Sequence, residues 1–344
     1  MAVAVFRARY QESAYGEKMG EIRFMLRLRV LLPALAFAYF GSAGAARLVA
    51  ASDSAIESGT DAAPDAAPGL ATDSVTVAEC GAPQPGWIFC DDFEVDRLDK
   101  YFEYVSDSGS FVRASGVGRD GSFGMRTRFE FGQVGAGRLL LAVGKTPQQY
   151  MRPADAGTAK YRELYWRFYV RLQPGWVGGG GDKLSRATVF TSPTSWAQAM
   201  IAHVWSGNSA TADGDFLTLD PARGTDAIGN VVTTTYNDFA RLTWLGASRG
   251  RRAIFAGTDV GQWHCIEARV RLNDPGHSNG LTNLWINGTL DAQRLGLNFL
   301  GNFTEYGLNG VFLENYWNSG SLARQERYID HFVVSTQRIG CLAT

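Results

Sequence analysis

The segment YRELYWRFYVRL, residues 161–172, carries two residue types that suit carboxylate binding and proton transfer. Alternate positions hold Tyr165, Arg167, Tyr169 and Arg171. The planar guanidinium of arginine binds a carboxylate through two parallel hydrogen bonds, and a tyrosine hydroxyl can give or take a proton. The positions between them, from Leu164 to Leu172, are apolar. Because strand side chains alternate between faces, this pattern predicts a strand with an apolar face toward a core. The Tyr/Arg row then faces a binding groove or bulk water, and alternation alone does not decide which.

Two further segments offer side chains for proton transfer and for stacking on a ligand. In AMIAHVWSG, His203 is a candidate acid or base and Trp205 a stacking platform for a ligand ring. In FLENYWNSG, Glu314 and Tyr316 share one face, with Tyr316 a second candidate acid or base and Glu314 a candidate substrate-binding residue. Trp317, on the other face, is a second candidate platform. The alternative interpretation makes each of these an ordinary packing residue.

The surrounding sequence predicts an all-β protein built as a two-sheet antiparallel β-sandwich. Alternation recurs in FGMRTRFEF and HCIEARVRL, and Asn287-Gly288 between apolar residues is a strong hairpin signal. Long helical periodicity is missing, whereas glycine (40 residues) and aromatic residues (12%) are abundant. Two antiparallel sheets packed face to face fit this composition.

The first part of the chain predicts export. Arginines precede an apolar run from Val30 to Phe40, and small residues follow it, with Ala43-Gly44-Ala45 matching a cleavage pattern. This is the order of a secretory signal peptide. We therefore assign residues 1–46 to an N-terminal extension and signal peptide, and we expect a secreted or periplasmic protein. Residues 47–79 form an acidic Ala/Pro/Ser linker, expected to be disordered. The folded β domain then spans residues 80–344.

Charge and cysteine content restrict the partners and the compartment. The net charge of −1 argues against nucleic acid and against membrane association after signal cleavage. We expect a monomer. An even number of cysteines in an exported domain predicts two disulfides. Three pairings are open, and we favour Cys80–Cys90, a short local loop, with Cys265–Cys341, which attaches the last strand to an interior one.

The order of several motifs resembles the concanavalin A-like lectin/glucanase jelly-roll superfamily. Within it, the chain is most similar to secreted polysaccharide-lyase-type domains, such as alginate and glucuronan lyases. The match is carried by a W-x-C-x-E strand (263–267), an N-D-P-G-x-x-x-G turn (273–280) and a W-I-N-G hairpin (285–288), and it spans residues 87–340. The resemblance implies a curved sheet whose concave outer face binds a glycan and could be lined by the Tyr/Arg row.

The resemblance also implies a chemistry, β-elimination from a uronate-containing polysaccharide. Arg167 or Arg171 would neutralise the uronate, and His203, Tyr169 or Tyr316 would transfer protons. Lys183, in GGGGDKLSR, falls on a Gly-Gly-Lys-Leu segment beside the groove of similar lyases. Here Asp182 is inserted after the glycines, which departs from that pattern.

Two alternatives concern other chemistry. The paired acids of a retaining glucanase, in E-x-D-x-E spacing, are not found, which argues against hydrolysis of that type. No cofactor is expected, apart from a structural Ca²⁺ that Asp92 and Asp330 would ligate if the first and last strands pair. The competing interpretation is that these carboxylates cap loops.

The sequence thus predicts a carbohydrate-active protein whose partner is an acidic polysaccharide. A polysaccharide lyase is the first hypothesis. A non-catalytic, lectin-like carbohydrate-binding module is the second, because it needs aromatic platforms but no acid–base pair. A structural envelope or adhesion domain is the third.

Overall fold

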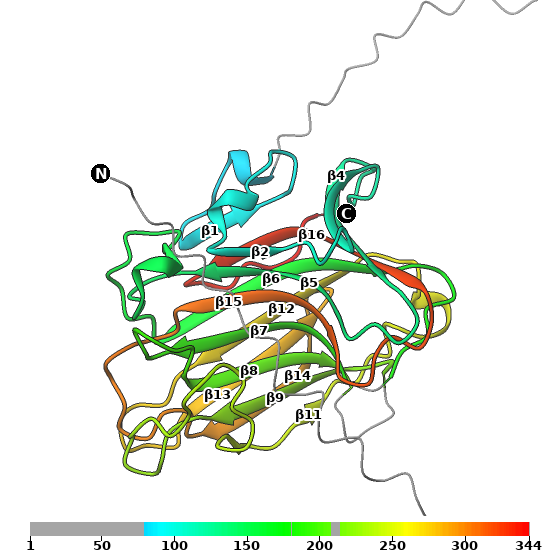
Figure 1. Ribbon diagram of the computed structural model, residues 1–344. Helices are drawn as coiled ribbons and strands as arrows, with labels where there is room; N and C mark the ends of the chain where they lie inside the picture. Colours follow the sequence, from blue (N-terminus) through cyan, green and yellow to red (C-terminus); the bar gives the residue numbers. More distant parts are fainter. Residues whose placement is uncertain (1–78, 180, 208–213, 344) are drawn as a thin grey trace, which may run out of the picture. The chain divides into compact units, whose positions relative to one another are not determined.

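The fold consists of two eight-stranded antiparallel sheets, as expected for a β-sandwich (Figure 1). The computed structural model describes residues 79–179, 181–207 and 214–343. The expected signal peptide and all of the expected linker except Glu79 lie outside these residues. No helix among the described residues has the length and apolarity required to cross a membrane.

The first sheet, called sheet A, contains the Tyr/Arg strand at its centre. Its spatial order is β14 (Thr289–Leu297), β13 (Gly280–Ile286), β12 (His264–Arg271), β6 (Glu163–Leu172), β16 (Gln325–Ser335), β4 (Phe123–Phe129) and β3 (Phe111–Ser115), and β1 (Trp87–Asp91) pairs with β16. The long strand β16 changes partner along its length, because its first half pairs with β4 and its last residues pair with β1. The change occurs at His331, which has a positive φ of 50°.

The second sheet, sheet B, forms the other layer. Its spatial order is β10 (Thr243–Trp244), β9 (Leu217–Arg223), β8 (Gln198–Ser206), β7 (Asp182–Phe190), β15 (Gly310–Trp317), β5 (Gly135–Ala142) and β2 (Glu103–Val105), and β11 (Ser248–Arg249) pairs with β9. Short 3₁₀ turns lie outside the sheets: η1 (Glu79–Gly81), η2 (Leu98–Lys100), η3 (Gln149–Met151) and η4 (Gly257–Asp259).

The core lies between the sheets and contains the apolar side chains expected from alternation. Leu164, Trp166, Phe168 and Val170 of β6 are fully buried, and the Trp166 indole donates a hydrogen bond of 3.1 Å to Ser185 Oγ of β7. Burying such side chains removes apolar surface from water, which stabilises the fold by roughly 25 cal/mol per Å² of buried surface. Because the apolar face of β6 points inward, its Tyr/Arg row lies on the outer face of sheet A.

A buried arginine also connects the sheets. Arg327 of β16 is fully buried and forms an ion pair of 2.6 Å with Asp182 of β7. Its guanidinium also donates to the backbone oxygens of Lys183 and Glu314, at 3.2 and 2.9 Å. This side chain therefore fixes the backbone of β7 beside that of β15.

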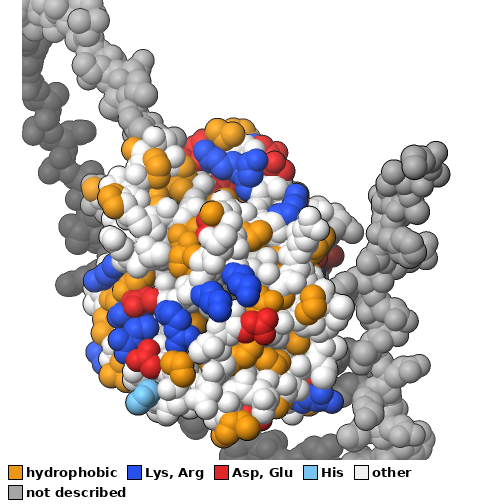
Figure 2. All heavy atoms as spheres, turned by 90° about the vertical axis from the view of Figure 1, so that its left-hand side faces the viewer, with side chains coloured by type: hydrophobic (Ala, Val, Ile, Leu, Met, Phe, Trp, Pro, Cys, Tyr) orange, Lys and Arg blue, Asp and Glu red, His pale blue; other side chains and the backbone are white. Residues whose placement is uncertain are grey.

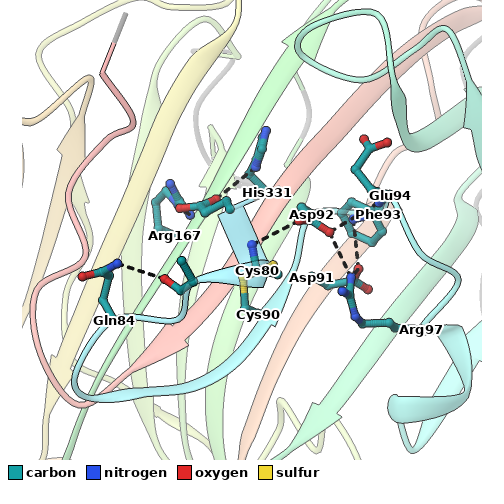
Figure 3. The surroundings of a disulfide bond; sticks show 12 residues. Cys80, Gln84, Cys90, Asp91, Asp92, Phe93, Glu94, Arg97, Arg167 and His331 are labelled. Atoms are coloured by element: carbon teal, nitrogen blue, oxygen red, sulfur yellow. Dashed lines mark hydrogen bonds and ion pairs between the residues drawn. A yellow bond between two sulfur atoms is a disulfide. The ribbon is translucent and has the colours of Figure 1, made fainter. Parts of the chain in front are cut away.

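Both favoured disulfides are present, Cys80–Cys90 and Cys265–Cys341. The first connects η1 to β1, beside the ion pairs of Arg97 with Asp91 and Asp92 (Figure 3). The second connects the carboxy-terminal segment to β12. Both disulfides fit an oxidising compartment.

Candidate functional site

The centre of the Tyr/Arg row is covered by the two ends of the described chain. Arg167 is 1% exposed and forms an ion pair of 2.6 Å with Glu79. Tyr169 is 4% exposed, and its hydroxyl accepts a hydrogen bond of 2.7 Å from the Leu342 backbone. Glu79 lies between Arg167 and His331, whose Nδ1 is 3.0 Å from its carboxylate (Figure 3). These contacts make Arg167 and Tyr169 attachment points for the chain ends.

Tyr165 and Arg171, at the two ends of the Tyr/Arg row, are less buried. The Tyr165 hydroxyl donates to Glu163 at 3.0 Å, and its ring stacks on Trp285 of β13. The Arg171 guanidinium lies between the rings of Trp263 and Tyr328. Neither residue approaches His203, which is on sheet B.

The expectation of one site that combines the row with His203 is therefore wrong. Strand β6 pairs with β12 and β16, whereas His203 is on β8, which pairs with β7 and β9. The alternation of side chains reveals which face of a strand is polar. It does not reveal which sheet the strand joins, and here the two candidate groups lie on the outer faces of opposite sheets.

The remaining candidates do converge, on the outer face of sheet B. In the register of the strands, Lys183 of β7 lies opposite Trp205 of β8 and Tyr316 of β15. Arg186 of β7 lies opposite His203 of β8. The register is irregular between residues 183 and 185. Since residues three apart on a regular strand face opposite sides, this bulge allows Lys183 and Arg186 to share the outer face.

Lys183 lies in a box of aromatic rings. Its Nζ is 4.5 Å from the ring centre of Tyr316, 5.1 Å from that of Phe239 and 5.3 Å from that of Trp205. The side chain is 3% exposed, and its ammonium makes no hydrogen bond or ion pair with the described residues. Burial lowers the pKa of Lys183 to about 8, although the charge of Glu314 opposes the effect. An ammonium group here is stabilised by ring faces, and no carboxylate of residues 79–179, 181–207 and 214–343 is bound to it.

His203 has one satisfied ring nitrogen and one that is not. Its Nδ1 is 3.3 Å from the backbone oxygen of Asp220, which requires the proton on Nδ1. Its buried Nε2 has no hydrogen-bond partner among the described residues. Burial lowers the pKa of His203 well below its usual range, and the charges of Arg186 and Lys183 act in the same direction. The imidazole is therefore neutral at neutral pH, with a lone pair on Nε2.

Arg186 and Glu314 form a buried pair behind these groups. The guanidinium is 2.5 Å from the Glu314 carboxylate and donates a hydrogen bond of 2.6 Å to Asn237 Oδ1. It also contacts the Tyr236 hydroxyl. Glu314 is only 4% exposed. Its carboxylate therefore balances the charge of Arg186 and is not open to a ligand.

The accessible parts of this cluster are aromatic. Tyr316 and Trp244 are each 42% exposed, and Trp244 stacks on the His203 imidazole at 5.9 Å. Trp205 is 4% exposed and packs edge-on against His203 at 4.6 Å. A sugar ring that approached this face would meet Tyr316 and Trp244 first, with Lys183 and His203 behind them.

Trp317 does not serve as a platform, contrary to expectation. It is fully buried between the sheets, where its ring stacks on Trp176 at 5.6 Å and meets Phe129 edge-on. Alternation along β15 places Tyr316 outside and its neighbour inside.

The two carboxylates considered as calcium ligands are occupied by protein donors. Asp92 accepts hydrogen bonds from the Cys80 backbone at 3.1 Å and from Arg97 at 2.9 Å. Asp330 accepts from the backbone nitrogens of Arg119 and His331, both at 2.7 Å. Within residues 79–179, 181–207 and 214–343, no group of three or more His, Cys, Asp or Glu side chains is arranged to hold a metal ion. A calcium site here stays a prediction.

Several residues of the cluster are absent from the sequence-based candidates. Arg186 directly follows the predicted lysine motif, and an arginine inside an otherwise buried strand was a usable signal. Phe239 and Trp244 come from the chain after β9, where the sequence has no periodic pattern that would place them. The Asp220 carboxyl, on β9 beside His203, has its pKa raised by burial to about 6.

The geometry defines an all-β, two-sheet sandwich with a lysine, histidine and tyrosine cluster on the outer face of one sheet. No family model matches the chain, and no curated protein matches it. Similar solved structures include an endo-β-1,4-glucuronan lyase from the fungus Trichoderma reesei, with 12% identity and a TM-score of 0.48, covering 73% of this chain and 96% of that one. An alginate lyase from Aplysia kurodai has 13% identity and a TM-score of 0.48, covering 73% and 99%. An alginate lyase from a Chlorella virus has 10% identity and a TM-score of 0.47, covering 69% and 100%. These belong to the classes that the sequence motifs resemble, and they assign a role to no residue of this chain.

Proposed function

We propose that this is an exported protein that binds an acidic polysaccharide on the outer face of sheet B and cleaves it by β-elimination. The observation that carries the proposal is Lys183, a buried ammonium with no anion bound to it among the described residues. A substrate carboxylate would supply that anion. Neutralising a uronate carboxylate in this way acidifies the proton on the adjacent carbon, which is the first requirement of the reaction.

The neighbouring side chains fit the two proton transfers. The His203 Nε2 lone pair would accept the proton from C5 as the C4–C5 double bond forms. The bond from C4 to the glycosidic oxygen would break, and the Tyr316 hydroxyl would donate its proton to that oxygen. This assignment replaces Arg167 and Arg171 with Lys183 as the group that neutralises the uronate.

Access to the lysine requires a movement of the aromatic box. Lys183 and His203 are covered by the rings of Tyr316, Phe239 and Trp244. A sugar that stacks on Trp244 would have to displace one of these rings to bring its carboxylate to Nζ.

The test is the ultraviolet absorbance of the unsaturated uronate that β-elimination creates, measured with alginate, glucuronan and pectin-type polymers. We expect absorbance to rise with the wild-type chain and the rise to be lost, by 10²-fold or more, in Tyr316→Phe. Tyr165→Phe, on sheet A, is the matched control and should retain full activity. A flat trace with every uronate polymer would contradict the proposal.

The burial of His203 favours a second candidate function, a non-catalytic carbohydrate-binding module. In such a module Trp244 and Tyr316 would stack on sugars, with the groups beneath them supporting the rings. Binding of a uronate polymer without any absorbance change, and lost in Trp244→Ala, would be the corresponding result.

A further inference from the structure

The outer face of sheet A carries several arginines, most of which have partners. Arg128 of β4 forms an ion pair of 2.7 Å with Glu326, and Arg269 of β12 forms one of 2.7 Å with Glu163. Arg271 donates to the backbone oxygen of Asn279 at 2.7 Å. These donors are satisfied within the chain.

Two arginines on this face differ from the others. The guanidinium groups of Arg126 on β4 and Arg171 on β6 make no hydrogen bond or ion pair with the part of the chain that the structure describes. Their Nε atoms are buried and without a hydrogen-bond partner in that part. A buried guanidinium donor without an acceptor is costly, so each of these groups is poised to gain from an added acceptor.

The two arginines flank one tyrosine. In the register of sheet A, Tyr328 of β16 lies between Arg171 on one side and Arg126 on the other. Neighbouring strands are about 4.8 Å apart, so the two arginine backbones are separated by roughly 10 Å. The Arg171 guanidinium is held between the rings of Tyr328, at 4.7 Å, and Trp263, at 4.9 Å. Its orientation is therefore set before any ligand arrives.

The local charge is positive. Glu326 lies two residues before Tyr328 on β16, and its carboxylate is already bound to Arg128 and to the Tyr328 hydroxyl. On the face shown in Figure 2, several Lys and Arg side chains lie beside Asp or Glu side chains. Further along β6, Arg167 already binds a carboxylate, that of Glu79, so this row accepts carboxylates.

We propose that Arg126, Tyr328 and Arg171 form a second, non-catalytic binding surface for a polysaccharide that carries carboxylate groups. Each guanidinium would bind one carboxylate through its planar fork, and Tyr328, whose ring contacts the Arg171 guanidinium, would lie between the two bound carboxylates. The surface lies on sheet A, opposite Lys183, and the proposal extends the proposed function without depending on turnover.

The rival occupant is the chain's own acidic segment, residues 50–78. Its acids are separated from one another by at least three other residues. A polymer with a carboxylate on every sugar can offer one to each guanidinium in any register. The polysaccharide is therefore the occupant that fits the paired arginines better.

Affinity electrophoresis of the full chain in native gels tests the proposal, with alginate as the probe and dextran as the neutral control. The reference protein carries Tyr316→Phe so that the polymer is not consumed. Adding Arg126→Gln with Arg171→Gln removes both guanidinium groups and should weaken alginate binding about tenfold, which corresponds to about 1.4 kcal/mol. Adding Arg269→Gln with Arg271→Gln is the matched control and should change binding less than twofold. Unchanged near-ultraviolet circular dichroism shows that the variants are folded.

Equal alginate affinity in the Arg126/Arg171 variant and the reference would overturn the proposal. It would also be overturned if alginate bound this surface only after Asp61, Asp65 and Asp73 were replaced by Asn, because the acidic segment would then be the occupant. Arginine-dependent binding without any β-elimination by the wild-type chain would support this surface and reject the proposed function. β-Elimination by the wild-type chain, together with binding that does not depend on these arginines, would reject this surface alone.

Discussion

Lys183 should lower the stability of the fold that it serves. Its pKa falls from 10.5 to about 8 because the ammonium is buried, and that difference corresponds to about 3 kcal/mol at roughly 1.4 kcal/mol per tenfold change in proton affinity. The three surrounding rings offset part of this cost, by about 1–2 kcal/mol together. Burial therefore outweighs the rings, and Lys183→Met should raise the free energy of unfolding by about 1–2 kcal/mol at pH 7 while abolishing turnover.

The effect has a defined pH dependence. Because the folded-state pKa of Lys183 is lowered, the unfolded chain binds more protons than the folded chain between about pH 8 and 10.5. The loss of stability caused by the buried ammonium therefore becomes smaller as pH rises through this window. The stability advantage of Lys183→Met should thus be about 2 kcal/mol smaller at about pH 9.5 than at pH 7.

Urea unfolding of both proteins at the two pH values measures this difference. Lys160→Met removes an exposed lysine and is the control, with an expected change within about 0.5 kcal/mol. A Lys183→Met variant less stable than wild type at pH 7, or a difference independent of pH, would refute the reasoning.

Two other perturbations test how the sandwich is held together. Arg327→Met leaves Asp182 buried without its cation and should cost about 3–5 kcal/mol in urea unfolding; if Asp182→Asn in the same chain recovered none of this, the ion pair would not be the cause. Replacing Cys265 and Cys341 with Ser opens a loop with a sequence separation of 76 and should cost about 4 kcal/mol, against about 3 kcal/mol for the Cys80/Cys90 pair with a separation of 10. Equal melting temperatures for the two disulfide variants and wild type would argue against both crosslinks.

The sequence predicted which face of a strand is apolar better than it predicted which strands pair. Alternation correctly buried Leu164 to Val170 and put Tyr316 and Trp317 on opposite faces, because the two-residue period is a local property of a strand. Pairing between strands is non-local, so the same pattern did not place β6 in sheet A or His203 in sheet B. The disulfides were predictable because few cysteines leave few pairings.

The site was predictable only in part. Lys183, His203, Trp205 and Tyr316 were candidates, and the structure brings them together. The box that encloses Lys183 also needs Phe239, which comes from a segment without a periodic pattern. The bulge that turns Lys183 outward depends on the register of three strands, which no single stretch of sequence specifies.

Strand β16 has a consequence for the order of events during biosynthesis. It is the last strand of the described residues, yet it lies at the centre of sheet A, between β6 on one side and β4 and β1 on the other. A nascent chain that lacks residues 325–335 leaves the edges of β6, β4 and β1 unpaired and lacks Arg327, which fixes the backbone of Lys183. Sheet A therefore closes only after residues 325–335 have been translated, and non-local pairing of this kind is slow. A truncation that ends before β16 would remove the middle of a sheet, and its unpaired strand edges would favour aggregation.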